Sequence, residues 1–251
     1  MTKLEAVQEV EGKVALVTGG TGGIGAALAE ALLVAGAARV IVAARSTCVG
    51  DHDRRCTRQL DVTSADSVAR LAAEFGNEVD ILINNAGINT GKRLFQTTLA
   101  DVRSEMDVNF YGMLNMVQAF CPAMCARGGG AVVNLLSIVA HCNLPLMATY
   151  SASKAAAMSL MQGLRGELRR YGVRVYGVFP ALVDTPMSAH VPAPKLAPAE
   201  LARIIVAALA SGEEDIYPGT AADTMAAFRR DAKAVERSMA ARLLGPAGQG
   251  N

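Results

Sequence analysis

Short apolar runs alternate with helix-forming stretches along the first half of the chain. Largely apolar runs of six residues, typical of buried parallel strands, lie at 13–18, 39–44 and 79–84. Helix formers fill 26–33, and Ser64 is a candidate N-cap for a second helix over 65–75. Alternating strands and helices predict an α/β fold, a doubly wound parallel sheet (Rossmann fold) in three α/β/α layers.

The same patterns predict the remaining elements. Expected strands lie at 58–63, 131–137, 173–178 and 215–217, and expected helices at 99–120, from 150 onward, and at 199–209. Residues 47–57 show no helical period, so the crossover there is expected to be short or irregular. Charged and apolar residues at helical spacing over 224–244 predict a C-terminal helical extension, which packs on its own domain or on a partner.

Composition favours one domain over residues 1–251, although two small domains remain possible. The chain is 51% hydrophobic, and its net charge of +1 points to neither nucleic acid nor a membrane surface. Small molecules are therefore the expected partners. The five cysteines include no Cys-x-x-Cys pair and, being odd in number, do not indicate a disulfide framework. No apolar run is long enough to span a bilayer, and the first residues are polar rather than those of a signal peptide. We therefore expect a cytoplasmic protein.

A glycine-rich loop follows the first expected strand. Residues 19–25 read Gly-Gly-Thr-Gly-Gly-Ile-Gly and fit both Gly-x-Gly-x-x-Gly and Gly-x-x-x-Gly-x-Gly spacings. Glycines allow a tight turn and let a pyrophosphate approach the helix N-terminus, whose free N–H groups attract anions. A loop between strand and helix favours dinucleotide binding over a purely structural turn.

Two charged residues at strand ends bear on the choice of dinucleotide. Arg45 and Ser46 end the second strand, twenty residues after Gly25, where an arginine suits the 2′-phosphate of NADP and an acid would suit the 2′-hydroxyl of NAD. NADP(H) is therefore preferred and NAD(H) possible, unless Arg45 is only a solvated strand end. Asp61 ends the third expected strand, where its carboxylate could reach the adenine amino group.

Polar side chains also end the later strands. Asn84 and Asn85 can join neighbouring strand ends, and Gly87 lets a cofactor pass closely. Asn109 lies within a largely apolar helix face. It is either a functional amide or a core amide that bends the helix. Ser137 ends the fifth strand, before a loop over 138–149.

Tyr150 and Lys154 lie four residues apart and would share one face of a helix. A phenol with a pKa of about 10 is a poor acid-base catalyst at neutral pH, but a neighbouring cation lowers that pKa. The pair is a candidate proton donor and acceptor, with an ordinary helix surface as the alternative.

The cysteines offer no convincing metal or redox site. Cys48, His52 and Cys56 recur every four residues, but three ligands among flanking charges favour a solvated loop. Cys121 and Cys125 lie one helical turn apart and are expected to be buried, inert thiols.

Several motifs together resemble the short-chain dehydrogenase/reductase family over residues 13–217. They are TGGTGGIG at 18–25, NNAG at 84–87, Asn109, Ser137 and YSASK at 150–154. The resemblance implies a nicotinamide-dependent carbonyl reductase or alcohol dehydrogenase without a metal, assembled as a homodimer or homotetramer.

The resemblance also implies roles for four catalytic residues. Tyr150 would protonate the carbonyl oxygen, or deprotonate the alcohol in the reverse direction. Lys154 would hold the nicotinamide ribose and lower the tyrosine pKa. Ser137 would orient the substrate oxygen, and Asn109 would hold a water that links Lys154 to solvent.

Cofactor and substrate positions follow from the same resemblance and from the chain order. The expected cofactor-binding residues are Gly19, Thr21, Gly23, Ile24, Gly25, Arg45, Ser46, Asp61, Val62, Asn85, Ala86, Gly87, Tyr150, Lys154, Pro180, Val183 and Thr185. Ala181 stands where the family usually has glycine. The four prolines of 186–198 suggest a short lid, and His141, Leu144 and Met187 suggest a mainly apolar substrate pocket.

Two other functions remain open from the sequence. One is a dinucleotide-binding sensor without turnover, although such a protein has no need of the residues of a proton relay. The other is a sugar-nucleotide epimerase or dehydratase, which would normally require a larger segment after Pro180.

Overall fold

A single parallel sheet forms the centre of the molecule. The computed structural model describes residues 10–46 and 51–243. Its strands are β1 (Val14–Thr18), β2 (Arg39–Ala44), β3 (Arg55–Gln59), β4 (Ile81–Asn84), β5 (Gly130–Leu135), β6 (Val173–Val178) and β7 (Asp215–Ile216). Their order, β3-β2-β1-β4-β5-β6-β7, reverses direction between β1 and β4, and all pairs are parallel. The predicted Rossmann fold is confirmed.

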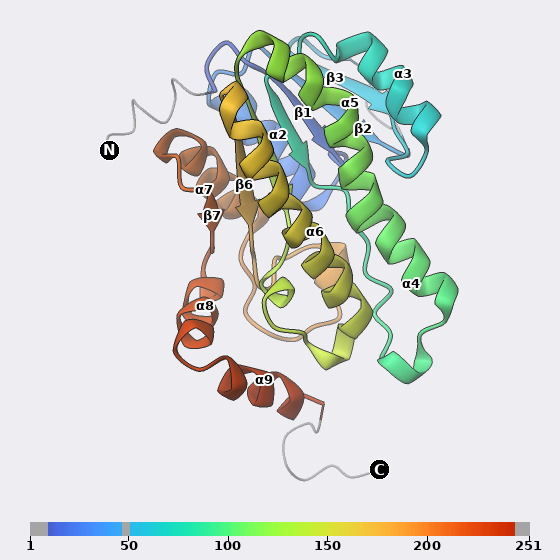
Figure 1. Ribbon diagram of the computed structural model, residues 1–251, viewed down its shortest axis with the longest axis vertical. Coiled ribbons are helices and arrows are strands. Elements are labelled where there is room, and N and C mark those ends of the chain that lie inside the picture. The colour runs from blue at the N-terminus through green and yellow to red at the C-terminus, as the bar shows by residue number, and fades with distance from the viewer. Residues whose placement is uncertain (1–9, 47–50, 244–251) are drawn as a thin grey trace.

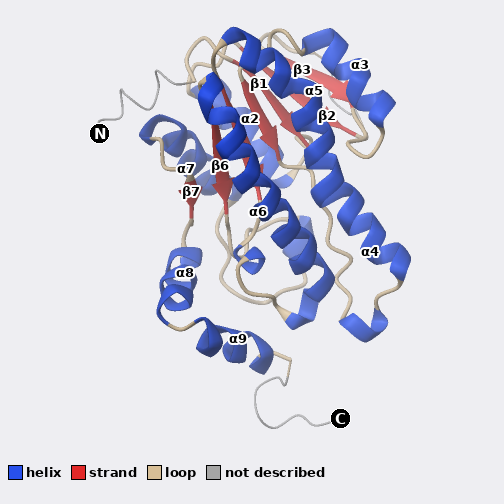
Figure 2. Ribbon diagram, viewed as in Figure 1, coloured by secondary structure: helices blue, strands red, loops and turns tan. Residues whose placement is uncertain are grey.

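Helices cover both faces of this sheet (Figures 1 and 2). On one face, α2 (Gly23–Val34) packs against α7 (Pro198–Ser211), with Leu28 and Ile205 fully buried between them and the strands. The other face carries α3 (Ala65–Phe75), α5 (Gly112–Arg127) and α6 (Ala148–Leu168), whose apolar sides form a second core around Phe120. The three predicted layers are therefore present.

Several predicted bounds agree closely with the structure, but the third strand was misplaced. The strands at 39–44 and 173–178 and the helix at 65–75, capped by Ser64, have the expected bounds. The predicted strand at 58–63 is wrong, since β3 already ends at Gln59. The chain leaves the sheet there because Asp61 Oδ1 accepts hydrogen bonds from the backbone N–H and hydroxyl of Thr63.

The long helix predicted at 99–120 is interrupted by a wide turn. It consists of α4 (Leu99–Met106), a π-helical turn (Asp107–Tyr111) and α5, which continues to Arg127. Asn109 lies within the π turn and is 3% exposed. Turns of this kind are rare in proteins overall, but those that occur often lie at functional sites.

The C-terminal extension is two helices, so the single helix expected at 224–244 is wrong within the described residues. They are α8 (Thr220–Arg230) and α9 (Ala232–Ala241). The break falls at Asp231, which is extended and whose carboxylate accepts from Ala234 N to cap α9. Within the described ranges, every helix is too short or too polar to span a bilayer.

The two C-terminal helices pack against the loop that follows β5. That loop contains short 3-10 turns at Ile138–Ala140 and Pro145–Met147. One apolar cluster joins it to α8 and α9; its fully packed members are Ile138, Val139, Cys142, Leu144, Ala221, Met225, Val235 and Met239. The helices therefore cover the segment between Ser137 and Tyr150.

Candidate active site

Asn85 joins the ends of β1 and β4, where the strand order reverses. Its Nδ2 donates to the carbonyl oxygens of Thr18 (2.9 Å) and Gly19 (3.1 Å). In return, the hydroxyl of Thr18 accepts from the backbone N–H groups of Asn85 and Ala86, each at 3.0 Å. This confirms that an amide after β4 holds neighbouring strand ends together, at the switch point where doubly wound sheets bind ligands.

The glycine loop has a shape that only glycine permits. Gly19 and Gly23 have φ angles of +64° and +52°, which other residues rarely adopt. A Cβ at Gly25 would lie 2.4 Å from the Gly19 carbonyl oxygen. No side chain caps the N-terminus of α2 and no acid lies in its first turn, so its N–H groups can receive an anion. The loop fits a dinucleotide pyrophosphate.

Other predicted cofactor residues lie around this loop. Arg45 and Ser46 are exposed at the end of β2. Hydrogen bonds from Thr63, with a smaller contribution from the charge of Arg45, lower the pKa of Asp61. The Thr185 methyl carbon lies 3.3 Å from the Cβ position of Gly23, so the segment after β6 reaches the glycine loop.

Lys154 and Asn109 meet at Gly87. Lys154 is 5% exposed, and its Nζ donates to the Leu135 carbonyl oxygen at 2.7 Å. A Cβ at Gly87 would lie 3.1 Å from Asn109 Oδ1 and 3.4 Å from Lys154 Nζ, so the absent side chain leaves both polar atoms room. The same Nζ lies 5.8 Å from the centre of the Tyr150 ring.

Asn109 binds both the loop after β4 and helix α6. Its amide donates to Ile88 O and to Ser153 Oγ and accepts from Ile88 N, all at 2.9 Å. Ser153 in turn donates to the Tyr150 carbonyl oxygen at 2.7 Å. Asn109 is thus a buried core amide that also fixes the helix carrying Tyr150 and Lys154.

Burial shifts both members of the Tyr150–Lys154 pair toward their neutral forms. It raises the pKa of Tyr150 to about 12, although a hydrogen bond with Ser137 opposes the rise. Burial also lowers the pKa of Lys154 to about 8. Burial is the largest effect on the pKa of Tyr150 in this structure, and it acts against the lowering by Lys154 that the family resemblance implies. At neutral pH Tyr150 is a phenol that can donate a proton.

The predicted pocket residues differ in their surroundings. His141 Nε2 lies 3.2 Å from the Tyr217 hydroxyl, and its ring centre lies 4.7 Å from that of Phe179. Leu144 is buried in the cluster beneath α8 and α9, whereas Met187 is 44% exposed. The hydroxyl of Ser137, the residue expected to orient the substrate oxygen, donates to the Pro180 carbonyl oxygen at 3.4 Å.

The sequence analysis missed Glu105 and Tyr217. Glu105 is 1% exposed, although its sequence neighbourhood is that of a surface helix.

Among the described residues no three His, Cys, Asp or Glu side chains form a metal site. Cys48 lies outside those residues. Burial raises the pKa of the Cys121 thiol to about 12, as expected of an inert cysteine.

The fold and the glycine loop define a dinucleotide-binding oxidoreductase. The short chain dehydrogenase family profile matches residues 13–195. The chain therefore belongs to the short-chain dehydrogenase/reductase family, whose members are oxidoreductases acting on CH–OH groups with a nicotinamide dinucleotide.

Similar proteins include characterised and uncharacterised oxidoreductases. An uncharacterised oxidoreductase of Staphylococcus saprophyticus is 34% identical over 193 residues, covering 72% of this chain and 82% of the relative. A sorbitol dehydrogenase of Cereibacter sphaeroides is 36% identical, with 70% of this chain and 72% of the relative covered. A crystal structure of a short chain dehydrogenase from Burkholderia cenocepacia in complex with NADP has a TM-score of 0.87 and 41% identity, over 94% of this chain and 99% of that one.

Gly25→Ala should weaken dinucleotide binding. The added carbon would overlap the Gly19 carbonyl oxygen, so the loop must move away from the shape that receives the pyrophosphate, and we expect the Kd for NADPH to rise about tenfold, which is about 1.4 kcal/mol of binding free energy. Titration of NADPH fluorescence measures it. Gly166→Ala on α6 is the matched control, because it lies outside the loop and nothing lies within 4 Å of its Cβ position. Equal affinities for the two variants would contradict the assignment of the loop.

Proposed function

We propose that this protein is an NADP(H)-preferring oxidoreductase that reduces a ketone or aldehyde to an alcohol, or catalyses the reverse reaction. The observation that carries the proposal is the position of the buried Lys154 ammonium, 5.8 Å from the centre of the Tyr150 ring, in a fold whose glycine loop can receive a dinucleotide. When bound, the cofactor supplies or accepts the hydride. The protein's share of the chemistry is positioning and proton transfer.

Each relay residue then has a defined part in reduction. Ser137 donates a hydrogen bond to the carbonyl oxygen, and Tyr150 gives that oxygen its proton as the C=O bond becomes C–OH. Lys154 has three N–H donors, of which one goes to Leu135 O, so others can hold the nicotinamide ribose. Asn109 keeps α6 in register with the loop after β4.

Arg45 supports the NADP(H) preference. Its guanidinium is exposed at the end of β2, with Ser46 following and no acidic residue at either position. An arginine binds a 2′-phosphate strongly and leaves a 2′-hydroxyl without an acceptor carboxylate. The NADP complex of the Burkholderia relative supports the same choice.

The C-terminal helices support an apolar substrate. The cluster they form with the post-Ser137 loop also contacts Tyr150 and Ala181, so apolar side chains surround one side of the proton donor. We propose that α8 and α9 belong to the same domain as the sheet and form this wall. We propose that Met187, which is exposed on the segment after β6, also contacts the substrate.

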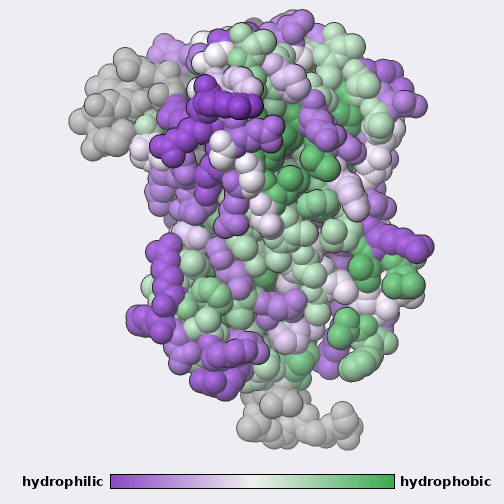
Figure 3. All heavy atoms as spheres, viewed as in Figure 1, coloured by the Kyte–Doolittle hydropathy of each residue, from purple (hydrophilic) through white to green (hydrophobic). Residues whose placement is uncertain are grey.

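An exposed apolar patch supports a homodimer or homotetramer. Leu94, Phe95 and Leu99 are 56%, 102% and 74% exposed, at the start of α4. In Figure 3 apolar residues gather at the lower right, where Figure 1 shows this helix. Patches of this kind mark interaction sites.

Free thiols at Cys56, Cys121, Cys125 and Cys142 are compatible with the cytoplasm.

A screen of carbonyl compounds tests the function. We expect purified protein to consume NADPH, followed at 340 nm, with at least one apolar ketone or aldehyde, and to generate it from the matching alcohol. NADPH binding without turnover across a broad panel would contradict the proposal and favour a sensor.

Arg45→Ala tests the cofactor preference. A charge-assisted contact contributes about 1.5–3 kcal/mol, so kcat/KM for NADPH should fall about 10- to 100-fold while that for NADH stays unchanged. Arg203→Ala, an exposed arginine on α7, is the matched control. Wild-type preference for NADH, or an equal loss with both cofactors, would show that Arg45 does not bind a 2′-phosphate.

A further inference from the structure

Glu105 is a buried carboxylate one helical turn before Asn109. It is 1% exposed, and its Oε1 accepts from the backbone N–H (2.9 Å) and the hydroxyl (2.8 Å) of Thr90. Its Oε2 is also buried and has no hydrogen-bond partner among the described residues. A carboxylate so placed is costly to keep, and this one lies outside the set of relay residues described above.

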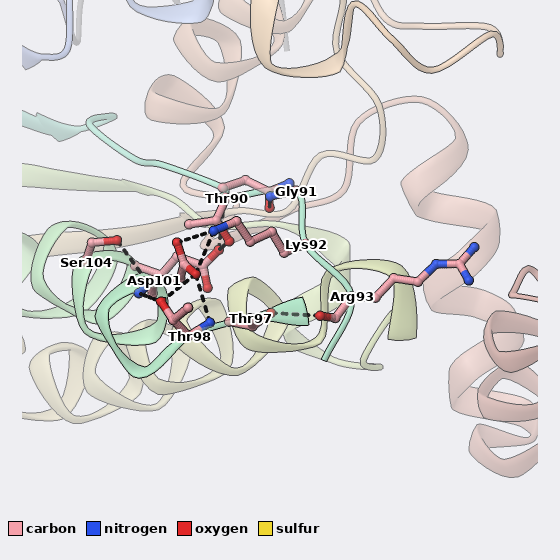
Figure 4. Close-up of polar contacts among 10 residues, drawn as sticks. Thr90, Gly91, Lys92, Arg93, Thr97, Thr98, Asp101 and Ser104 are labelled. Atoms are coloured by element: carbon pink, nitrogen blue, oxygen red, sulfur yellow. Dashed lines mark hydrogen bonds and ion pairs between the residues drawn. The ribbon is translucent and has the colours of Figure 1, made fainter. Parts of the chain in front are cut away.

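Glu105 and Asn109 hold the same loop at two residues that are separated only by Asn89. Asn109 binds both backbone polar groups of Ile88, and Glu105 binds both donors of Thr90. An outer tether lies further along, where Lys92 Nζ donates to the Asp101 carboxylate at 2.8 Å, and this carboxylate also accepts from the backbone N–H of Thr98, the N-cap of α4 (Figure 4). The loop after β4 is thus attached to α4 at a buried inner point and an exposed outer point.

The clamp reaches the proton donor through Asn109. The same amide that binds Ile88 donates to Ser153 Oγ, and the Ser153 hydroxyl donates to the Tyr150 carbonyl oxygen. Helix α4 also packs against α6, which carries Tyr150 and Lys154.

We propose that Glu105 is a positioning residue of the proton relay, which clamps Thr90 and so holds the loop after β4 where Ile88 binds Asn109. Glutamine has nearly the same shape as glutamate and retains an acceptor oxygen, so Glu105→Gln keeps the clamp, whereas Glu105→Ala removes it. This inference rests on the proposed function for its effect on catalysis, but the clamp can be measured without turnover.

Hydrogen–deuterium exchange tests the clamp in the full chain. Glu105→Ala should increase exchange in peptides covering 85–93, whereas Glu105→Gln should leave it near the wild-type rate. Asp101→Asn, which removes the outer tether on the same helix, should affect mainly residues 92–98. If Glu105→Ala does not fold, Thr90→Ala replaces it. Unchanged exchange over 85–93 in the variant that removes the clamp would overturn the proposal.

Turnover with NADPH tests the positioning role. Glu105→Ala should lower kcat by about tenfold or more because the loop that binds Asn109 loses its buried clamp, whereas Glu105→Gln should restore kcat to near the wild-type value and Asp101→Asn should leave it unchanged. The probe is 4-nitrobenzaldehyde or the best carbonyl from the screen.

The two tests separate this inference from the proposed function. Wild-type kcat in Glu105→Ala, or an equal loss of kcat in Glu105→Ala and Glu105→Gln, would overturn the positioning role. Absence of turnover in the wild type itself would contradict the proposed function instead, and the exchange measurement would still decide whether Glu105 clamps the loop.

Discussion

The buried amide of Asn109 joins segments that are distant in the sequence. Through Ile88 it fixes the loop after β4, and through Ser153 it fixes α6 beside the carbonyl of Tyr150. Each of these bonds is about 2.9 Å or shorter and is shielded from water, where a lost hydrogen bond is most costly. The π turn that carries Asn109 brings the amide into this position. The geometry of Tyr150 and Lys154 relative to the sheet depends on it.

The site retains polar groups that destabilise the fold. Lys154 is almost completely buried, and its lowered pKa reflects the cost of holding a cation there. Asn84 donates to Asn134 at 2.9 Å, but Asn84 Oδ1 and Asn134 Nδ2 have no partner within the described chain. A small cavity lined by Thr18, Asn84, Asn109 and Lys154, among others, lies next to these atoms. Such groups persist where they serve chemistry rather than stability.

The sequence predicts local features of the fold well where one element dictates them. Buried strands such as 39–44 and the Ser64-capped helix were predicted with correct bounds, because apolar runs and caps are local signals. The glycines at 19–25 were also predictable, since their φ angles and close contacts need residues without Cβ. The end of β3 at Gln59 depends on side-chain hydrogen bonds of Asp61 that an apolar pattern does not reveal.

Features that arise from tertiary contact could not be predicted in the same way. The sequence places Tyr150 and Lys154 on one helix face, but their pKa values follow from burial beneath loops distant in the chain. Glu105 has the local signature of a solvated helix, and only the packing of α4 on α6 buries it. The break at Asp231 likewise depends on how α9 folds back over the loop after β5.

The central claim is that Tyr150 supplies the proton and that the other residues position it. Tyr150→Phe removes only the hydroxyl and keeps the ring that packs against the C-terminal helices. We expect this variant to bind NADPH with a Kd within about twofold of the wild type and to lose about 10³-fold or more in kcat for the best carbonyl substrate. Turnover close to that of the wild type, with cofactor binding intact, would contradict the account.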